Sequence, residues 1–166
     1  MQEILQAYPS AQRALFQRYH VGGCSSCGFQ PTDTLQDVCL SHNISNVDEV
    51  IQHLKNSHDA DARIEISARD AATGLASKAF KLLDVRSQEE WDIAHIEGAQ
   101  LVTEQLGQEL MTQWPKDTPI VLHCHHGRRS LDAASYLIGH GFTNVRSMAG
   151  GIEAWSTDVD PSVPRY

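Results

Sequence analysis

The residues with the clearest chemical potential form one short segment around Cys124. The segment reads His123-Cys124-His125-His126-Gly127-Arg128-Arg129-Ser130 and follows an apolar run. Between a strand and a helix, such a loop can turn successive backbone N–H groups inward and create an anion-binding concavity. The positive N-terminal end of the helix and the charges of Arg128 and Arg129 add to this effect. Because all three features favour thiolate over thiol, we expect Cys124 to be a nucleophile.

We predict that the other residues of this loop bind an anion next to the thiolate. These residues are His125, His126, Gly127, Arg128, Arg129 and Ser130. The two histidines have two interpretations, either proton donation and anion recognition or solvent-facing residues that only tune the charge. Adjacent side chains of a strand and tight loop do not converge tetrahedrally, so we predict no metal site here. A purely structural role for a buried Cys124 is disfavoured, because burying this segment would also take the charges of the two adjacent arginines out of water.

The elements that must position this loop are strands that alternate with helices. Strands are predicted over residues 80–85, 99–102, 119–123 and 145–148. Helices are predicted at the capping box of Ser87 and Glu90, around Leu106 and Leu110, and over residues 130–140. This alternation predicts an α/β fold in which helices flank both faces of a parallel sheet. Ligands of such sheets bind beyond the carboxyl ends of the strands, and Cys124 follows one of them.

Residues 1–56 have a different pattern, which predicts a small all-α domain of three short helices. The first helix follows Ser10 and ends at Gly22-Gly23, the second opens with a capping box of Thr34 and Asp37, and the third follows Asn46. The polar stretch after them lacks periodicity. We therefore expect a helical domain at 1–56, a linker at 57–63, an α/β domain at 64–157 and a tail at 158–166.

Composition narrows the classes of partner. The chain has 166 residues with 13 basic and 21 acidic side chains, a net charge of −8. This balance disfavours nucleic acid, which requires clustered Lys and Arg. No apolar run approaches a membrane span and no secretory signal is visible. We therefore expect a cytoplasmic protein with neither nucleic-acid nor membrane partners.

Three separated motifs resemble the rhodanese family. Residues 82–102 contain DVR, HI and GA elements similar to its first signature. The loop resembles its active-site motif, Cys-x-x-Gly-x-Arg, at Cys124, Gly127 and Arg129, and residues 149–156, AGGIEAWS, resemble its closing signature. The likeness runs from about Ile64 to Ser156. It implies a single α/β domain whose cysteine carries sulfane sulfur as a persulfide, and we expect no cofactor or metal.

The resemblance also implies partners and leaves alternatives. The implied partners are a small anionic sulfur donor such as thiosulfate and a thiol or protein sulfur acceptor. A sulfur carrier or redox-sensing module with little turnover is one alternative, and a phosphatase is another. Phosphatases of this fold resemble His-Cys-x5-Arg, whereas Arg129 gives His-Cys-x4-Arg here and Ser130 holds the sixth position. The tighter loop favours a terminal sulfur over a phosphoryl group.

A second cysteine motif, Cys24-Ser25-Ser26-Cys27, lies in the helical block. Flanking glycines allow a tight turn, so these cysteines could form a redox or relay dithiol that accepts sulfur from Cys124. They could also be half of a metal site with Cys39 and His42, or inert turn residues. Cys39 is equally explained as part of an apolar helix face. The block resembles the small helical domain associated with hybrid-cluster proteins, at Cys24, Cys27, Gly28, Thr34, Leu35 and residues 47–54, which implies a redox-linked disulfide.

Overall fold

The computed structural model describes residues 1–8, 10–22 and 28–166 and divides into two compact units, Met1–Arg63 and Ile64–Tyr166. The described part of the first unit is helical. Its elements are α1 (Gln2–Ala7), α2 (Ala11–Tyr19), α3 (Leu35–Ser41) and α4 (Val47–Ile64). Their apolar faces share one core, which includes Leu15, Val21, Val38, Cys39, Val50 and Leu54.

Two of the expected helix starts are confirmed in this unit. Thr34 and Asp37 form a reciprocal capping box at α3, and the Asn46 side chain accepts a hydrogen bond from the Glu49 amide at 3.1 Å. The Ser10 side chain does not cap α2. That helix also ends before Gly22, at a left-handed His20 with φ of 56°.

The expected linker at 57–63 is helical and belongs to α4, which is a correction to the sequence interpretation. A tertiary contact accounts for the difference. Asp61 is buried and forms an ion pair with Arg13 of α2, so the polar last turns of α4 are held by a partner distant in sequence. The sequence pattern also does not predict α1, which is short and packs Ile4 and Leu5 against the core.

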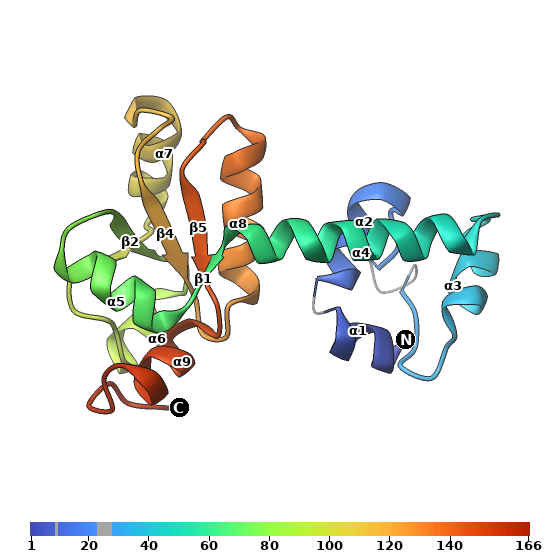
Figure 1. Ribbon diagram of the computed structural model, residues 1–166, viewed down its shortest axis with the longest axis horizontal. Helices are drawn as coiled ribbons and strands as arrows, with labels where there is room; N and C mark the ends of the chain where they lie inside the picture. Colours follow the sequence, from blue (N-terminus) through green and yellow to red (C-terminus); the bar gives the residue numbers. More distant parts are fainter. Residues whose placement is uncertain (9, 23–27) are drawn as a thin grey trace. The chain divides into compact units, whose positions relative to one another are not determined.

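The second unit is a parallel sheet of five strands in the order β1-β5-β4-β2-β3 (Figure 1). The strands are β1 (Glu65–Ile66), β2 (Lys81–Asp84), β3 (Gln100–Leu101), β4 (Ile120–His123) and β5 (Val145–Met148). The helices are α5 (Ala68–Ala76), α6 (Gln88–Ile93), α7 (Glu104–Gln113), α8 (Arg128–Gly139) and α9 (Gly151–Asp158). The predicted α/β class and parallel sheet are confirmed, and the predicted strands are each found, three of them shortened at their ends.

Helices cover both faces of this sheet. Alternate residues of the central strands point to opposite faces, as strand geometry requires. Leu82, Val121 and Met148 pack with α5 and α9, including Trp155. Leu83, Leu122 and Val145 pack on the other face with α7 and α8. All four residues of β4 are buried, which is typical of a central parallel strand. In the described part of the chain, no helix is both long enough and apolar enough to cross a membrane.

Candidate active site

Cys124 lies directly beyond the carboxyl end of β4, at the centre of the sheet. It is a free cysteine and only 1% exposed. The carbonyl groups of Cys124 and His125 both point toward α9. The carbonyl oxygen of Cys124 accepts from the Ile152 amide at 2.8 Å, and that of His125 accepts from the Glu153 amide at 3.2 Å. In a trans peptide the N–H is opposite the C=O, so the amides of His125 and His126 point away from α9.

Gly151 allows this close approach between the loop and α9. A Cβ at Gly151 would lie 2.3 Å from the carbonyl oxygens of both Cys124 and His125. Gly151 also has a φ of 59°, in the left-handed region. A side chain at this position would therefore push the loop out of place. Gly151 of the closing motif thus has a direct physical role, which is to let the α9 N-terminus contact the Cys124 loop.

The N-terminus of α8 faces the same loop. Its N-cap residue is Gly127, with a φ of 90°, and glycine has no side chain that could occupy the first N–H groups. In the first turn, the buried Ser130 hydroxyl lies 3.6 Å from the Cys124 sulfur and 3.0 Å from the Gly127 carbonyl oxygen. Ser147 of β5 donates to Ser130 at 2.9 Å. These contacts place a hydroxyl and the positive end of a 12-residue helix beside the thiol.

Arg129 forms a bidentate ion pair with Glu90 of α6. The two N–O distances are 2.6 Å each. The hydrogen bonds to Glu90 raise the pKa of the guanidinium, and attraction to Cys124 raises it further. The same pair holds the pKa of Glu90 at about 2. Arg129 therefore stays charged beside the thiol, but a carboxylate already occupies much of its hydrogen-bonding capacity.

Asp84, Arg86 and His123 form a buried polar cluster at the carboxyl ends of β2 and β4, next to the loop. Arg86 donates to both carboxylate oxygens of Asp84, at 2.6 to 3.0 Å, and to the Ala94 carbonyl at 2.7 Å. His123 pairs in register with Asp84 on the neighbouring strand and lies 3.6 Å from it. Burial lowers the pKa of His123 to about 4, so its ring is neutral at neutral pH. These contacts give Asp84 and Arg86 a structural role, which is to hold the ends of β2 and β4 next to the loop.

Two aromatic rings contact His125. The ring of His126 stacks on it at 4.0 Å, and the ring of Tyr166 lies 4.5 Å away on a tilt. Burial and the neighbouring His126 lower the pKa of His125. The Glu90 carboxylate is 3.9 Å from its Nδ1. His125 is therefore enclosed by groups of the site, whereas His126 is exposed.

Of the predicted loop residues, Ser130 and Arg129 lie beside the Cys124 sulfur, and sequence reasoning missed several of their partners. Glu90 was predicted only as a capping-box residue, and Ser147 and Tyr166 carry no local signal. Cys24 and Cys27 lie outside the described residues. Cys39 is a buried core thiol whose pKa is raised by burial, and His42 contacts the Val38 carbonyl. No metal-ligating cluster occurs among the residues that the structure describes.

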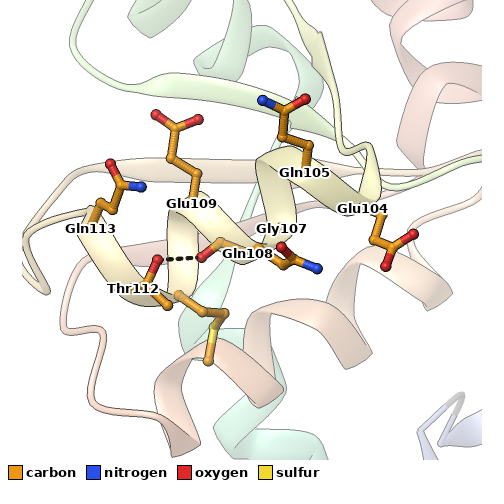
Figure 2. Close-up of a pocket in the computed structure, with 8 residues that line it drawn as sticks. Glu104, Gln105, Gly107, Gln108, Glu109, Thr112 and Gln113 are labelled. Carbon is orange, nitrogen blue, oxygen red and sulfur yellow. Dashed lines mark hydrogen bonds between the residues drawn. The ribbon is translucent and has the colours of Figure 1, made fainter.

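Two hollows of the second unit lie apart from the 123–130 loop. One hollow, of about 760 Å³, is lined by residues of α7: Glu104, Gln105, Gly107, Gln108, Glu109, Met111, Thr112 and Gln113. Figure 2 shows these side chains on the helix. An apolar hollow of about 430 Å³ between α7 and α8 includes Leu110, Ala133 and Leu137. Neither hollow contains any residue of the 123–130 loop.

The comparisons with known proteins agree on one family. The Rhodanese-like domain family matches residues 67–158. The thiosulfate sulfurtransferase GlpE of Vibrio cholerae is 35% identical over 92 residues, which are 55% of this chain and 87% of that protein. A probable adenylyltransferase/sulfurtransferase of Mycobacterium tuberculosis, MoeZ, is 37% identical over 104 residues, or 61% of this chain, and this chain spans 26% of its length. Among solved structures, the rhodanese-like domain of the Alr3790 protein from Anabaena has a TM-score of 0.51 and 26% identity, over 57% of this chain and 74% of that one.

Proposed function

The chain belongs to the rhodanese-like family, and we propose that it is a sulfurtransferase that carries sulfur as a persulfide on Cys124. One observation carries the proposal. The peptide groups after Cys124 are locked by α9 so that the His125 and His126 amides face away from it, while the α8 N-terminus, Ser130 and Arg129 adjoin the same sulfur. These donors would stabilise a thiolate and, after sulfur arrives, a persulfide anion.

The first half-reaction loads the sulfur. The Cys124 thiolate attacks the outer, sulfane sulfur of thiosulfate. A new S–S bond forms to Cys124, the donor S–S bond breaks, and sulfite leaves with the electron pair. The product is a cysteine persulfide. Arg129 and the loop amides would hold the anionic donor, since charge-assisted hydrogen bonds to oxyanions are stronger than neutral ones.

The second half-reaction discharges the sulfur. An S–S bond is about 2 Å long, so the terminal sulfur of the persulfide lies farther out than the buried Cys124 sulfur. A nucleophile attacks this terminal sulfur, and the Cys124 thiolate leaves. Cyanide would give thiocyanate, and a thiolate would give a new persulfide. No metal or cofactor is required by either step, because each is a displacement at sulfur.

The nature of the donor is supported by the relatives. GlpE, with 35% identity, is named a thiosulfate sulfurtransferase, and this chain spans 87% of its length. The position of Arg129 five residues after Cys124 supports a small terminal sulfur over a phosphoryl group. We therefore propose a small anionic donor of the thiosulfate type. Turnover separates this enzyme from a sulfur carrier, which would take up one sulfur without rapid discharge.

For the acceptor, we propose a cysteine-type thiol, and the Cys24/Cys27 pair is a candidate within the chain. Its support is the two-residue spacing and the flanking glycines of the sequence. One thiolate would attack the terminal sulfur of Cys124, and the second thiol would resolve the resulting persulfide, which forms a disulfide and releases hydrosulfide. This proposal extends the resemblance of residues 1–56 to a redox-linked helical domain.

The test is the intact and peptide mass of the full chain after exposure to thiosulfate. We expect a gain of one sulfur atom on Cys124 that a reductant removes. Cys124→Ser should lose both this mass gain and thiosulfate:cyanide activity, whereas Cys39→Ser is the matched control for a buried thiol distant from the loop in sequence. Full activity in Cys124→Ser would contradict the proposal.

A further inference from the structure

The residues after the family-matched region fold back onto the candidate site. The family match ends at residue 158, and the chain then turns at Asp160, whose carboxylate accepts from the Ser162 amide and hydroxyl. Val163 is buried in the core on the α9 face of the sheet. Arg165 forms an ion pair with Glu153 of α9. Figure 1 shows this segment in red, with the marked end beside α9. The expected tail is thus a packed part of the second unit.

Tyr166, in this segment, connects two loops of the site. Its hydroxyl contacts Arg86 at 2.5 Å and Glu90 at 3.4 Å, both of which follow β2. Its ring lies 4.5 Å from the ring of His125, the residue next to Cys124. The side chain of His125 is only 17% exposed. The two rings therefore stand together near Glu90, at the residue that directly follows Cys124.

We propose that Tyr166 is a specificity-determining residue, whose ring with that of His125 forms an aromatic wall that admits unhindered thiols to Cys124 and disfavours branched ones. The proposal rests on the proposed function for its acceptor chemistry. Because Cys124 is 1% exposed, an incoming nucleophile must pass the side chains at the loop edge. A wall at this edge would favour a thiol on a CH2 group, as in cysteine, over a thiol on a fully substituted carbon.

The ring itself, rather than the hydroxyl, is the operative part of this wall. The segment is anchored independently by the burial of Val163 and by the Arg165–Glu153 pair. Loss of the hydroxyl should therefore leave the ring in place. Tyr166→Phe and Tyr166→Ala separate the two contributions, since the first keeps the ring and the second removes it. Tyr136→Ala is the matched control, because Tyr136 is an exposed tyrosine of α8 that contacts His140.

The first experiment measures access to the thiol without any sulfur transfer. Full-length protein is alkylated with iodoacetamide or with the bulkier N-phenylmaleimide, and modification of Cys124 is followed by peptide mass. We expect Tyr166→Ala to raise the rate ratio of maleimide to iodoacetamide by about tenfold. Tyr166→Phe and Tyr136→Ala should leave this ratio within about twofold of the original. The proposal is contradicted if the ratio is unchanged in a folded Tyr166→Ala protein, or if it rises as much in Tyr166→Phe as in Tyr166→Ala.

The second experiment measures selection between acceptors. The persulfide form is discharged by cysteine or by penicillamine, which differs by two methyl groups on the carbon that bears the thiol. Tyr166→Ala should raise the penicillamine-to-cysteine rate ratio by about tenfold, and an unchanged ratio overturns the assignment. If no persulfide forms on Cys124 in the unaltered protein, the proposed function fails. The alkylation ratio still shows in that case whether the Tyr166 ring restricts access to the Cys124 thiol.

Discussion

Arg129 and Glu90 face each other across 39 positions of the sequence, joined by two hydrogen bonds of 2.6 Å. The pair lies beside Cys124, so the guanidinium that is expected to bind an anionic donor is already bound to a carboxylate. A donor must compete with Glu90 for the same N–H groups. This relationship predicts that Glu90, besides capping a helix, affects the affinity for the proposed donor.

Glu90→Gln should lower the KM for thiosulfate by about threefold to tenfold, because the competing carboxylate becomes a neutral amide of the same shape. Steady-state thiosulfate:cyanide kinetics check this. Glu89→Gln is the matched control, since it removes one charge from the same turn of α6, and it should leave KM unchanged. A higher KM in Glu90→Gln would mean that Glu90 positions Arg129 and does not compete with the donor.

Arg129→Ala should lower kcat/KM for thiosulfate by about tenfold or more, since a charge-assisted contact to the donor and the thiolate is removed. Arg69→Ala removes the same charge from an exposed position of α5 and should have little effect. Kinetics that are the same in Arg129→Ala as in the unaltered protein would remove this residue from the site.

The neutral His123 predicts acid sensitivity. Its pKa is lowered by burial from 6.5 to about 4 in the folded protein. Below pH 6.5 the unfolded chain therefore binds a proton that the folded protein does not, so stability falls as pH falls. The contribution is complete above pH 6.5 and is lost progressively toward about pH 4. Thermal unfolding across this range should be less pH-dependent in His123→Gln, whereas His140→Gln, an exposed control, should keep the original slope.

Gly151→Ala should destabilise the fold and displace the active loop. The added Cβ would lie 2.3 Å from two carbonyl oxygens, and the position has a positive φ. We expect a loss of at least ~2 kcal/mol in the free energy of unfolding, together with loss of activity. Gly139→Ala in α8 is the control, because a Cβ there meets no atom within 4 Å and alanine favours helix. Equal stability of the two variants in denaturant unfolding would refute the packing argument.

The relay proposal predicts the lifetime of the persulfide. Without external thiol, the reduced protein should lose its Cys124 persulfide faster than a variant with both Cys24→Ser and Cys27→Ser, because the dithiol can attack and resolve it. Time-resolved peptide mass measures both decays. Equal decay would end the relay within one chain while leaving redox sensing by these cysteines open. Stoichiometric zinc or iron in the purified protein would instead favour the metal interpretation and would bring in Cys39 and His42.

Local sequence was sufficient to predict the elements on either side of Cys124. An apolar run with no polar interruption predicts the central strand that ends at His123, and glycine with arginine after Cys124 predicts the turn into α8. Capping boxes at Thr34 and Ser87 are equally local, and both are present. These features depend on residues within a few positions of each other, so periodicity and composition are enough to predict them.

Tertiary packing decided which distant residues share the site. Nothing near Glu90 in the sequence indicates Arg129 as its partner, and Tyr166 reaches Arg86 across 80 positions. The helical end of α4 likewise depends on the pairing of Asp61 with Arg13, 48 positions earlier. Side chains far apart in sequence meet only when the sheet order and the packing of its helices bring them together. The sequence by itself therefore predicted the strand, the turn and the cysteine between them, and the tertiary structure determined which distant groups lie against that loop.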